Sequence, residues 1–320
     1  MQPEPSLHKE ESRLVINKKI KSSLITVAII AIATIIALGV LQFWKKPSAE
    51  NYLNLGNTYL QQEQYAQAVT SYSKAIEIDP QNKPAYYYRG LAYYYQKDYT
   101  QALADYTKLI ELDPKSSKGY GNRGNIYVKL AQYTAALNDY NKAIQLDPQD
   151  VFLYKNRGKL FFQQQQYTQA IGDFTNAINL DSQDADTYTS LGSAYYNQKQ
   201  YSQAITNLTK AIQLDPNMEL AYYNRGLAYH DQGKYELALL DFTQAIQLYP
   251  QDVDAYFSRG TTHYDLEQYA EAVTDYTQAI QLAPDYADVY HWRGLAYQKL
   301  GQKTQSDSDL KKADELKGTP

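Results

Sequence analysis

Most of the chain repeats two short hydrophobic patterns, each with the spacing of an amphipathic helix. From residue 49 onward, similar residues recur with helical spacing at positions 4, 7, 8 and 11 of a 34-residue window, and again at positions 17, 20, 24 and 27. Small residues at positions 8 and 20 let the two helices approach closely. Proline near position 32 ends the second helix, because it disfavours helical geometry in the residue before it. The pattern predicts two packed helices per window and an all-α fold.

Glycine and tyrosine set the register of this repeat. Glycine occupies position 8 and tyrosine position 4 in all eight windows. A self-similarity of this length and copy number indicates a repeat architecture, in which each unit packs on the next. The predicted repeats are 49–82, 83–116, 117–150, 151–184, 185–218, 219–252, 253–286 and 287–320.

The motif aromatic-x2-[R/L]-G-x2-[Y/F]…A-x3-[Y/F]…P, which runs through residues 49–320, resembles the tetratricopeptide repeat family. The resemblance implies a right-handed α-solenoid, or superhelix, of eight helix-turn-helix units whose first helices line a concave groove. The last helical segment, QKTQSDSDLKKADELKG, has Lys303 and Ser306 where other repeats have Tyr and Ala. Because a stack must end on a face that tolerates water, we expect this segment to be a cap.

Arginine at position 7 and aspartate at position 23 vary together. Six repeats have both residues, whereas the repeats with Leu55 and Leu191 at position 7 have Ser71 and Asn207 at position 23. Losing one partner of a semi-buried ion pair strands a charge, so joint change indicates a semi-buried pair between the two helices of one repeat. The predicted structural ion pairs are Arg89 with Asp105, Arg123 with Asp139, Arg157 with Asp173, Arg225 with Asp241, Arg259 with Asp275 and Arg293 with Asp309.

A strongly apolar segment precedes the repeats. The segment from Leu24 to Leu41 contains 18 residues without a charge. The wider window 22–44 has the length of a transmembrane helix, which is about 20 residues. Five Lys or Arg residues precede it and two lysines follow, so the positive-inside pattern makes residues 1–21 a basic cytoplasmic tail. A cleaved signal peptide is the alternative, although its apolar region is usually shorter. We expect a single-pass membrane protein, with a linker at 45–48 and the repeat domain, 49–320, on the non-cytoplasmic side.

Composition narrows the classes of function. The chain has no cysteine, and the repeats carry 24 Lys and Arg against 32 Asp and Glu, which argues against a nucleic-acid partner. The four histidines lack metal-ligand spacing, and no phosphate loop or nucleophile elbow occurs. The repeats also leave no room for a catalytic domain. We therefore expect no catalytic residues, no metal, no cofactor and no enzymatic activity.

The expected function lies in the groove. The groove positions differ most among the repeats, as an asymmetric protein or extended peptide would require. The predicted groove residues are Tyr87, Tyr94, Tyr95, Lys118, Lys129, Lys155, Lys159, Tyr196, Tyr223, His230, Phe257 and Tyr264. The four lysines form a basic zone in repeats 3 and 4, and repeats 6 to 8 supply an acidic zone, so the groove would orient its ligand by charge.

These patterns predict a membrane-tethered scaffold for protein–protein interaction and complex assembly. Two other classes stay open. One is an envelope glycan-binding module that uses the groove tyrosines as stacking platforms, and the other is an accessory subunit of a membrane or secretion machine. A homo-oligomer is compatible with all three.

Overall fold

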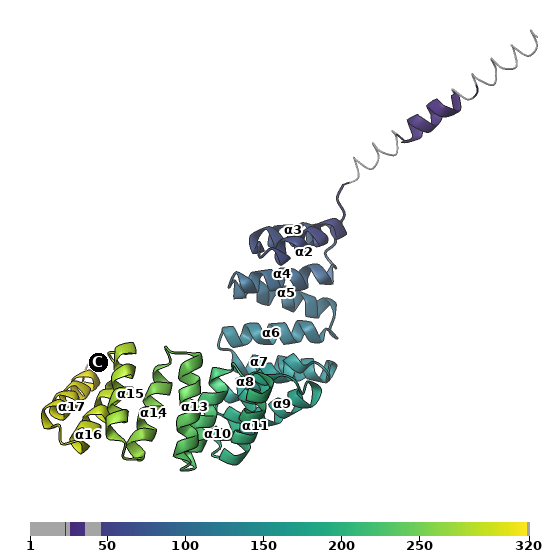
Figure 1. Ribbon diagram of the computed structural model, residues 1–320. Coiled ribbons are helices and arrows are strands. Elements are labelled where there is room, and N and C mark those ends of the chain that lie inside the picture. The colour runs from purple at the N-terminus through teal and green to yellow at the C-terminus, as the bar shows by residue number, and fades with distance from the viewer. Residues whose placement is uncertain (1–22, 24–25, 36–45, 319–320) are drawn as a thin grey trace, which may run out of the picture. The chain divides into compact units, whose positions relative to one another are not determined.

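The computed structural model describes residue 23, residues 26–35 and residues 46–318, and these residues form helices and no strands (Figure 1). The chain divides into two compact units, residues 1–96 and residues 97–320, which we call the N-terminal and C-terminal units. The N-terminal unit contains α2 (Ala49–Gln61), α3 (Tyr65–Ile78) and α4 (Lys83–Tyr95).

The C-terminal unit is a row of helices, in which each predicted repeat from 117 onward contributes two (Figure 1). Its helices are α5 (Tyr99–Leu112), α6 (Ser117–Lys129), α7 (Tyr133–Leu146), α8 (Val151–Gln163), α9 (Tyr167–Leu180), α10 (Ala185–Asn197), α11 (Tyr201–Leu214), α12 (Glu219–Asp231), α13 (Tyr235–Leu248), α14 (Val253–Asp265), α15 (Tyr269–Leu282), α16 (Ala287–Lys299) and α17 (Lys303–Lys317).

Short polar segments end one helix and start the next. Between the helices of a repeat, position 15 adopts a left-handed conformation, as at Gln165 with φ 59° and Gly233 with φ 71°. Between repeats, the Asp147 side chain accepts a hydrogen bond from the Gln149 amide at 3.2 Å. Asp150 then caps α8 by accepting from the Phe152 amide at 2.9 Å. These local bonds satisfy backbone groups that helix ends leave unpaired, so they fix the helix boundaries.

Small residues bring the two helices of each repeat together. The alanines at position 20, such as Ala136 and Ala170, are fully buried. A Cβ atom added at Gly158 would lie 2.8 Å from Cε1 of Phe174 on the facing helix. Phe174 is itself 1% exposed and packs against Ala170 and Leu191. From residue 117 onward, the hydrophobic core therefore contains a row of aromatic or aliphatic side chains, each packed on the glycine of its own repeat.

The C-terminal unit is curved, with the first helices of the repeats inside. From α6 to α16, each first helix contacts the first helix of the next repeat, whereas no two second helices of the described residues contact each other to that extent. Closer approach on one side of a stack bends it toward that side. The C-terminal unit is thus an α-solenoid whose inner surface comes from α6, α8, α10, α12, α14 and α16.

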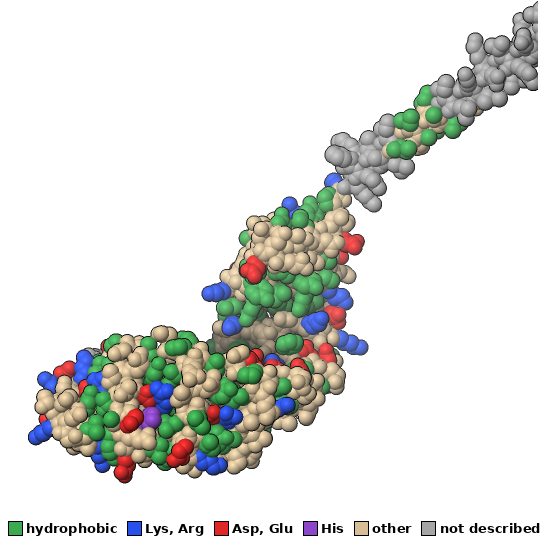
Figure 2. All heavy atoms as spheres, viewed as in Figure 1, with side chains coloured by type: hydrophobic (Ala, Val, Ile, Leu, Met, Phe, Trp, Pro, Cys, Tyr) green, Lys and Arg blue, Asp and Glu red, His purple; other side chains and the backbone are tan. Residues whose placement is uncertain are grey.

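The surface of the C-terminal unit mixes charges of both signs. On the face that Figure 2 shows, Lys and Arg side chains are interspersed with Asp and Glu side chains and with hydrophobic ones. Neither sign of charge dominates this face as a whole, so any charge preference for a ligand depends on local groups.

The segment predicted to span a membrane, 22–44, lies partly outside the described residues. Residues 26–35 within it are helical, and their side chains are exposed. In the part of the chain that the structure describes, no helix combines the length and the apolar character needed to cross a bilayer.

Candidate functional site: two hollows on the inner surface

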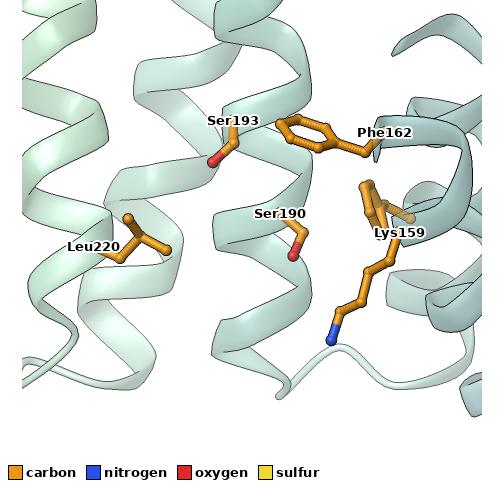
Figure 3. Close-up of a pocket in the computed structure, with 6 residues that line it drawn as sticks. Lys159, Phe162, Ser190, Ser193 and Leu220 are labelled. Atoms are coloured by element: carbon orange, nitrogen blue, oxygen red, sulfur yellow. The ribbon is translucent and has the colours of Figure 1, made fainter. Parts of the chain in front are cut away.

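The first hollow on the inner surface lies between α8, α10 and α12. This cavity of about 210 Å³ is lined by Lys159, Phe162, Phe174, Ser190, Ser193 and Leu220. Figure 3 shows Lys159 and Phe162 facing Ser190 and Ser193, with Leu220 on the far side. We call it the Lys159 hollow.

The polar side chains of the Lys159 hollow differ in whether they already have hydrogen-bond partners within the protein. The Ser193 hydroxyl donates to the Thr189 carbonyl at 2.8 Å and accepts from Asn224 Nδ2 at 2.9 Å. Ser190 donates to the Asp186 carbonyl at 2.9 Å. Lys159 is exposed and has no hydrogen bond or ion pair to any of the described residues. An ammonium group is therefore available beside an apolar cavity.

The second hollow lies between α12 and α14, above Phe242 of α13. This cavity of about 190 Å³ is lined by Leu227, His230, Asp231, Phe242, Phe257, Ser258 and Thr261. We call it the acidic hollow, because its charged neighbours are carboxylates. His230 lies between two of them, with Nδ1 3.4 Å from Asp231 Oδ1 and Nε2 3.0 Å from Asp265 Oδ2. The hydroxyl of Tyr196 also donates to Asp231, at 3.0 Å.

More carboxylates gather at the other end of the same helices. Burial, a hydrogen bond with Asp252 and the charge of Asp252 raise the pKa of Glu219 to about 7. Burial and the charge of Asp252 also raise the pKa of Asp254. The pKa of Tyr223, whose hydroxyl lies 3.5 Å from Ser258 in the acidic hollow, is raised to about 12 by burial and by the charges of Asp254 and Asp252. Negative charge therefore extends along this part of the inner surface.

The basic zone predicted in repeats 3 and 4 is smaller than the sequence suggests. Lys155 forms an ion pair with Asp184, which also accepts a hydrogen bond from Thr187. Its charge is thus neutralised by a residue 29 positions further along the chain. Lys118 and Lys129 are exposed, as is Lys159. The zone consists of three lysines with exposed side chains and one that is paired.

The predicted groove aromatics pack against other rings. In the C-terminal unit, the Phe257 ring lies 5.7 Å from that of Tyr286, and the Tyr264 ring lies 5.4 Å from that of Trp292. Tyr196 packs on Tyr201 at 5.8 Å, Tyr223 on Phe242 at 5.9 Å and His230 on Tyr235 at 5.3 Å. In the N-terminal unit, Tyr87 meets Tyr88 at 5.0 Å, Tyr94 meets Tyr95 at 5.8 Å, and Tyr95 stacks on Tyr65 at 5.1 Å. The predicted groove aromatics are therefore packed against neighbouring rings.

The structure places five of the predicted Arg–Asp pairs in contact within their repeats. The shortest N–O distances are 2.7 Å between Arg123 and Asp139, 2.6 Å between Arg157 and Asp173, 2.8 Å between Arg225 and Asp241, 2.6 Å between Arg259 and Asp275 and 2.6 Å between Arg293 and Asp309. The hydrogen bond to Asp139 raises the pKa of Arg123, against the opposing effect of burial. Arg89 and Asp105 belong to different units, so that pair stays a prediction.

The five pairs in contact are semi-buried, since the arginine side chains are 15% to 19% exposed and the aspartate side chains 5% to 9%. The more deeply buried partners are the aspartates at position 23. All six are only 4% to 7% exposed: Asp105, Asp139, Asp173, Asp241, Asp275 and Asp309. Their position lies where the helices of a repeat meet, since a Cβ added at Gly158 would lie 3.2 Å from Cβ of Asp173, and one added at Gly260 would lie 3.2 Å from Cβ of Asp275. The neighbouring helix therefore covers the carboxylate. These aspartates are structural groups and offer no surface to a ligand.

Each of the arginines also has partners that the sequence analysis missed. Arg225 lies 5.6 Å from the ring centre of Tyr222 and 5.9 Å from that of Tyr229, the tyrosines at positions 4 and 11. Its Nη1 donates to Thr209 of the preceding repeat at 3.0 Å. The signal for the last contact was present, because position 25 is Ser, Thr or Asn in seven repeats.

A third hollow lies away from the inner surface, around the same arginine. This cavity of about 430 Å³ is lined by Thr209, Tyr222, Arg225, Tyr229, Leu237, Leu240, Asp241 and Gln244. Leu237 is 44% and Leu240 67% exposed on α13. Both charged residues lining this hollow are paired with each other, so it offers no free charge. Among the described residues, no cluster of His, Asp and Glu is arranged to hold a metal ion.

Paired helices repeating every 34 residues around a curved inner surface define an α-solenoid repeat protein. Models of the TPR repeat, or tetratricopeptide repeat, match residues 56–97, 84–116, 105–138, 124–165, 158–199, 192–233, 220–252, 260–301 and 287–320. The chain belongs to the tetratricopeptide repeat family, as its sequence motif predicted.

Solved structures show the same fold. YrrB, described as a TPR protein with an unusual peptide-binding site, is 25% identical with a TM-score of 0.51, over 58% of this chain and 96% of that one. The C-terminal part of a TPR repeat-containing protein from Cytophaga hutchinsonii is 20% identical with a TM-score of 0.62, over 75% and 98% of the two chains. A tetratricopeptide repeat protein from Parabacteroides merdae is 20% identical with a TM-score of 0.56, over 78% and 98%. No curated protein sequence matched the chain.

Proposed function

We propose that this protein is a non-catalytic scaffold that holds an extended segment of a partner protein along the inner surface of its C-terminal unit. The observation that carries the proposal is the pair of hollows on that surface, each with an apolar floor and charged or polar groups at its edge. A polypeptide that anchors side chains in such hollows gains affinity from apolar burial, while charge at the edge sets its register.

The structural neighbour described as having a peptide-binding site supports the same interpretation, since it shares the fold at 25% identity. The aromatic side chains of the inner surface also already pack on one another. Side chains that are already packed lose less conformational entropy on binding than mobile ones. Recruitment of a partner into a complex is the activity that such a surface performs.

Leu220 allows a sharp test of this proposal. It lines the Lys159 hollow and is 52% exposed, so Leu220→Glu places a charge in the cavity with little effect on the core. Leu240→Glu is the matched control, because Leu240 is 67% exposed and lines the outer hollow. Affinity capture with the full-length protein, followed by titration of the recovered partner, should show a loss of about tenfold or more for Leu220→Glu only. Equal binding by both variants would place the interaction elsewhere.

The proposal includes a membrane tether at residues 22–44, supported by the 18 uncharged residues from Leu24 to Leu41. Full-length protein should remain in the membrane fraction after alkaline carbonate extraction, whereas a variant lacking residues 1–44 should not. Protease added to sealed vesicles tests the proposed non-cytoplasmic side of the repeats. Release of the full-length protein by carbonate would contradict the membrane tether but not the proposed binding of a partner on the inner surface.

A further inference from the structure

The acidic hollow has the shape of a pocket for one large side chain. Leu227, Phe242 and Phe257 form its apolar part, and its volume is about 190 Å³. An apolar cavity of about 150 Å³ in another protein admits benzene. One aromatic or branched aliphatic side chain therefore fits this hollow.

The carboxylates beside the acidic hollow are not balanced by Lys or Arg. Among the described residues, the only basic partner of Asp231 and Asp265 is His230, and Glu219, Asp252 and Asp254 form no ion pair with Lys or Arg. The next carboxylate along the inner surface is different, because Asp288 lies 2.9 Å from Lys317 Nζ. Toward the C-terminus, the run of unbalanced carboxylates thus ends before Asp288.

The unbalanced carboxylates lie on two sides of the apolar pocket. Asp231 lines the hollow itself, and Asp265 lies 3.0 Å from His230 in its wall. At the other end, Tyr223 lies between Ser258 of the hollow and the charges of Asp252 and Asp254. Burial and, secondly, the interaction with Asp252 hold the pKa of Glu219 and of Asp254 above their ordinary values, and a bound cation would offset the charge of Asp252.

We propose that the acidic hollow binds a basic segment of the partner protein, which places one aromatic or branched aliphatic side chain in the pocket and Lys or Arg side chains beside the carboxylates on its two sides. This inference rests on the proposed function, because it assigns the chemistry of the polypeptide that the inner surface holds. An acidic segment is disfavoured here, since like charges brought together cost free energy.

Synthetic peptides test this chemistry directly. The basic probe is a fluorescent peptide with a Phe-Leu pair flanked on each side by Lys-Arg, and two matched probes carry Glu-Glu flanks or an Ala-Ala centre. Fluorescence anisotropy with the full-length protein should give the tightest binding for the basic Phe-Leu probe, by about tenfold over either matched probe. Its affinity should also fall severalfold between about 50 mM and about 500 mM NaCl, because salt screens exposed charges.

Variants show whether the basic probe binds at this hollow or at a neighbouring part of the inner surface. Asp254→Asn combined with Asp265→Asn should weaken the basic probe by about tenfold, because both carboxylates are exposed and unbalanced. Lys159→Gln, in the other hollow, and Asp288→Asn, whose carboxylate is already paired, should leave its affinity unchanged. Thermal unfolding of each variant checks that the fold is retained.

Two results would overturn the inference: equal binding of the basic and acidic probes, or no loss in the Asp254→Asn/Asp265→Asn variant. Failure of every probe to bind would overturn it as well. None of these results decides the proposed function, because Leu220→Glu tests that function in a different hollow with the natural partner. An acidic probe that binds and is lost in Lys159→Gln would move the charge preference to the Lys159 hollow.

Discussion

Arg225 donates a hydrogen bond of 3.0 Å to Thr209, although the two residues belong to neighbouring repeats. The same guanidinium donates to both carboxylate oxygens of Asp241, at 2.8 Å each. One side chain therefore joins three helices, namely α11 of one repeat and α12 and α13 of the next. The bidentate geometry suits arginine and no other cationic side chain.

Removing Asp241 should destabilise the C-terminal unit strongly. The side chains of Arg225 and Asp241 are 16% and 7% exposed, so Asp241→Ala leaves a guanidinium with little solvent and no counter-charge, at a cost of about 3 kcal/mol. Arg225→Ala should also destabilise, and the double variant should be no worse than the more damaging single change. A double-mutant cycle from urea unfolding measures the coupling, expected at about 1–3 kcal/mol. A coupling of zero would show that the pair adds nothing to stability.

Thr209 should matter more than its equivalent in the preceding repeat. Thr209→Val keeps the shape of the side chain and removes the acceptor for Arg225, which should lower the free energy of unfolding by about 1 kcal/mol. Thr175 occupies the same position, but the next repeat has Leu191 in place of the arginine. Thr175→Val should therefore change stability little, and equal losses for the two variants in urea unfolding would contradict the bridging role of Thr209.

The repeat pattern predicted the helix pairs because a given position of the repeat has the same packing requirement in each copy. Gly158 must be small to seat Phe174, and the same requirement returns in each repeat from 117 onward. The Arg–Asp contacts were predictable for the same reason, since six copies change together. The depth of the aspartates was not, because covariation identifies partners and carries no measure of solvent exposure. A family motif and an internal covariation are thus enough to locate contacts that recur.

Contacts that occur only once produce neither a repeated motif nor an internal covariation. Lys155 pairs with Asp184 at the end of the same repeat, and no second repeat combines Lys with Asp at these positions. From the sequence alone, Lys155 therefore has the character of a free charge, which the structure contradicts. The acidic hollow was not predicted for the same reason, because the contact between His230 and Asp265 occurs at only one pair of neighbouring repeats.

Gly158→Ala should destabilise the repeat that contains it. The added Cβ would lie 2.8 Å from Phe174 Cε1, which forces the two helices apart at a cost of about 1–3 kcal/mol. Gly172→Ala is the matched control, because nothing lies within 4 Å of its added Cβ on α9. That change should stabilise the helix by about 0.5–1 kcal/mol. Chemical unfolding of both variants checks the opposite signs.

Glu219 should make stability depend on pH. Its pKa is raised from 4.5 to about 7 by burial and by Asp252, so the folded chain binds a proton between these values that the unfolded chain releases. The free energy of unfolding should consequently fall as pH rises from about 4.5 to about 7 and level off above it. Glu219→Gln should remove this contribution and, after allowance for solvent screening, stabilise by about 1 kcal/mol above pH 7.

Urea unfolding at several pH values distinguishes this effect from general titration. Glu236→Gln, at an exposed position of α13, is the control and should follow the wild-type profile. A Glu219→Gln profile that parallels the wild type between about pH 4.5 and 7 would show that Glu219 is not the titrating group.

The arginine hydrogen bonds between neighbouring repeats all run in one direction, from the arginine of one repeat to the repeat before it. Arg225, Arg259 and Arg293 each find a threonine in the repeat before them. The first repeat has no such neighbour, and it carries Leu55 instead. In a duplicated module inserted after repeat 6, the arginine would donate to the repeat before it and the threonine would accept from the repeat after it, whereas the same module placed ahead of repeat 1 would leave its arginine without an acceptor. Internal duplication would therefore keep every arginine paired while it adds one new row of side chains to the inner surface.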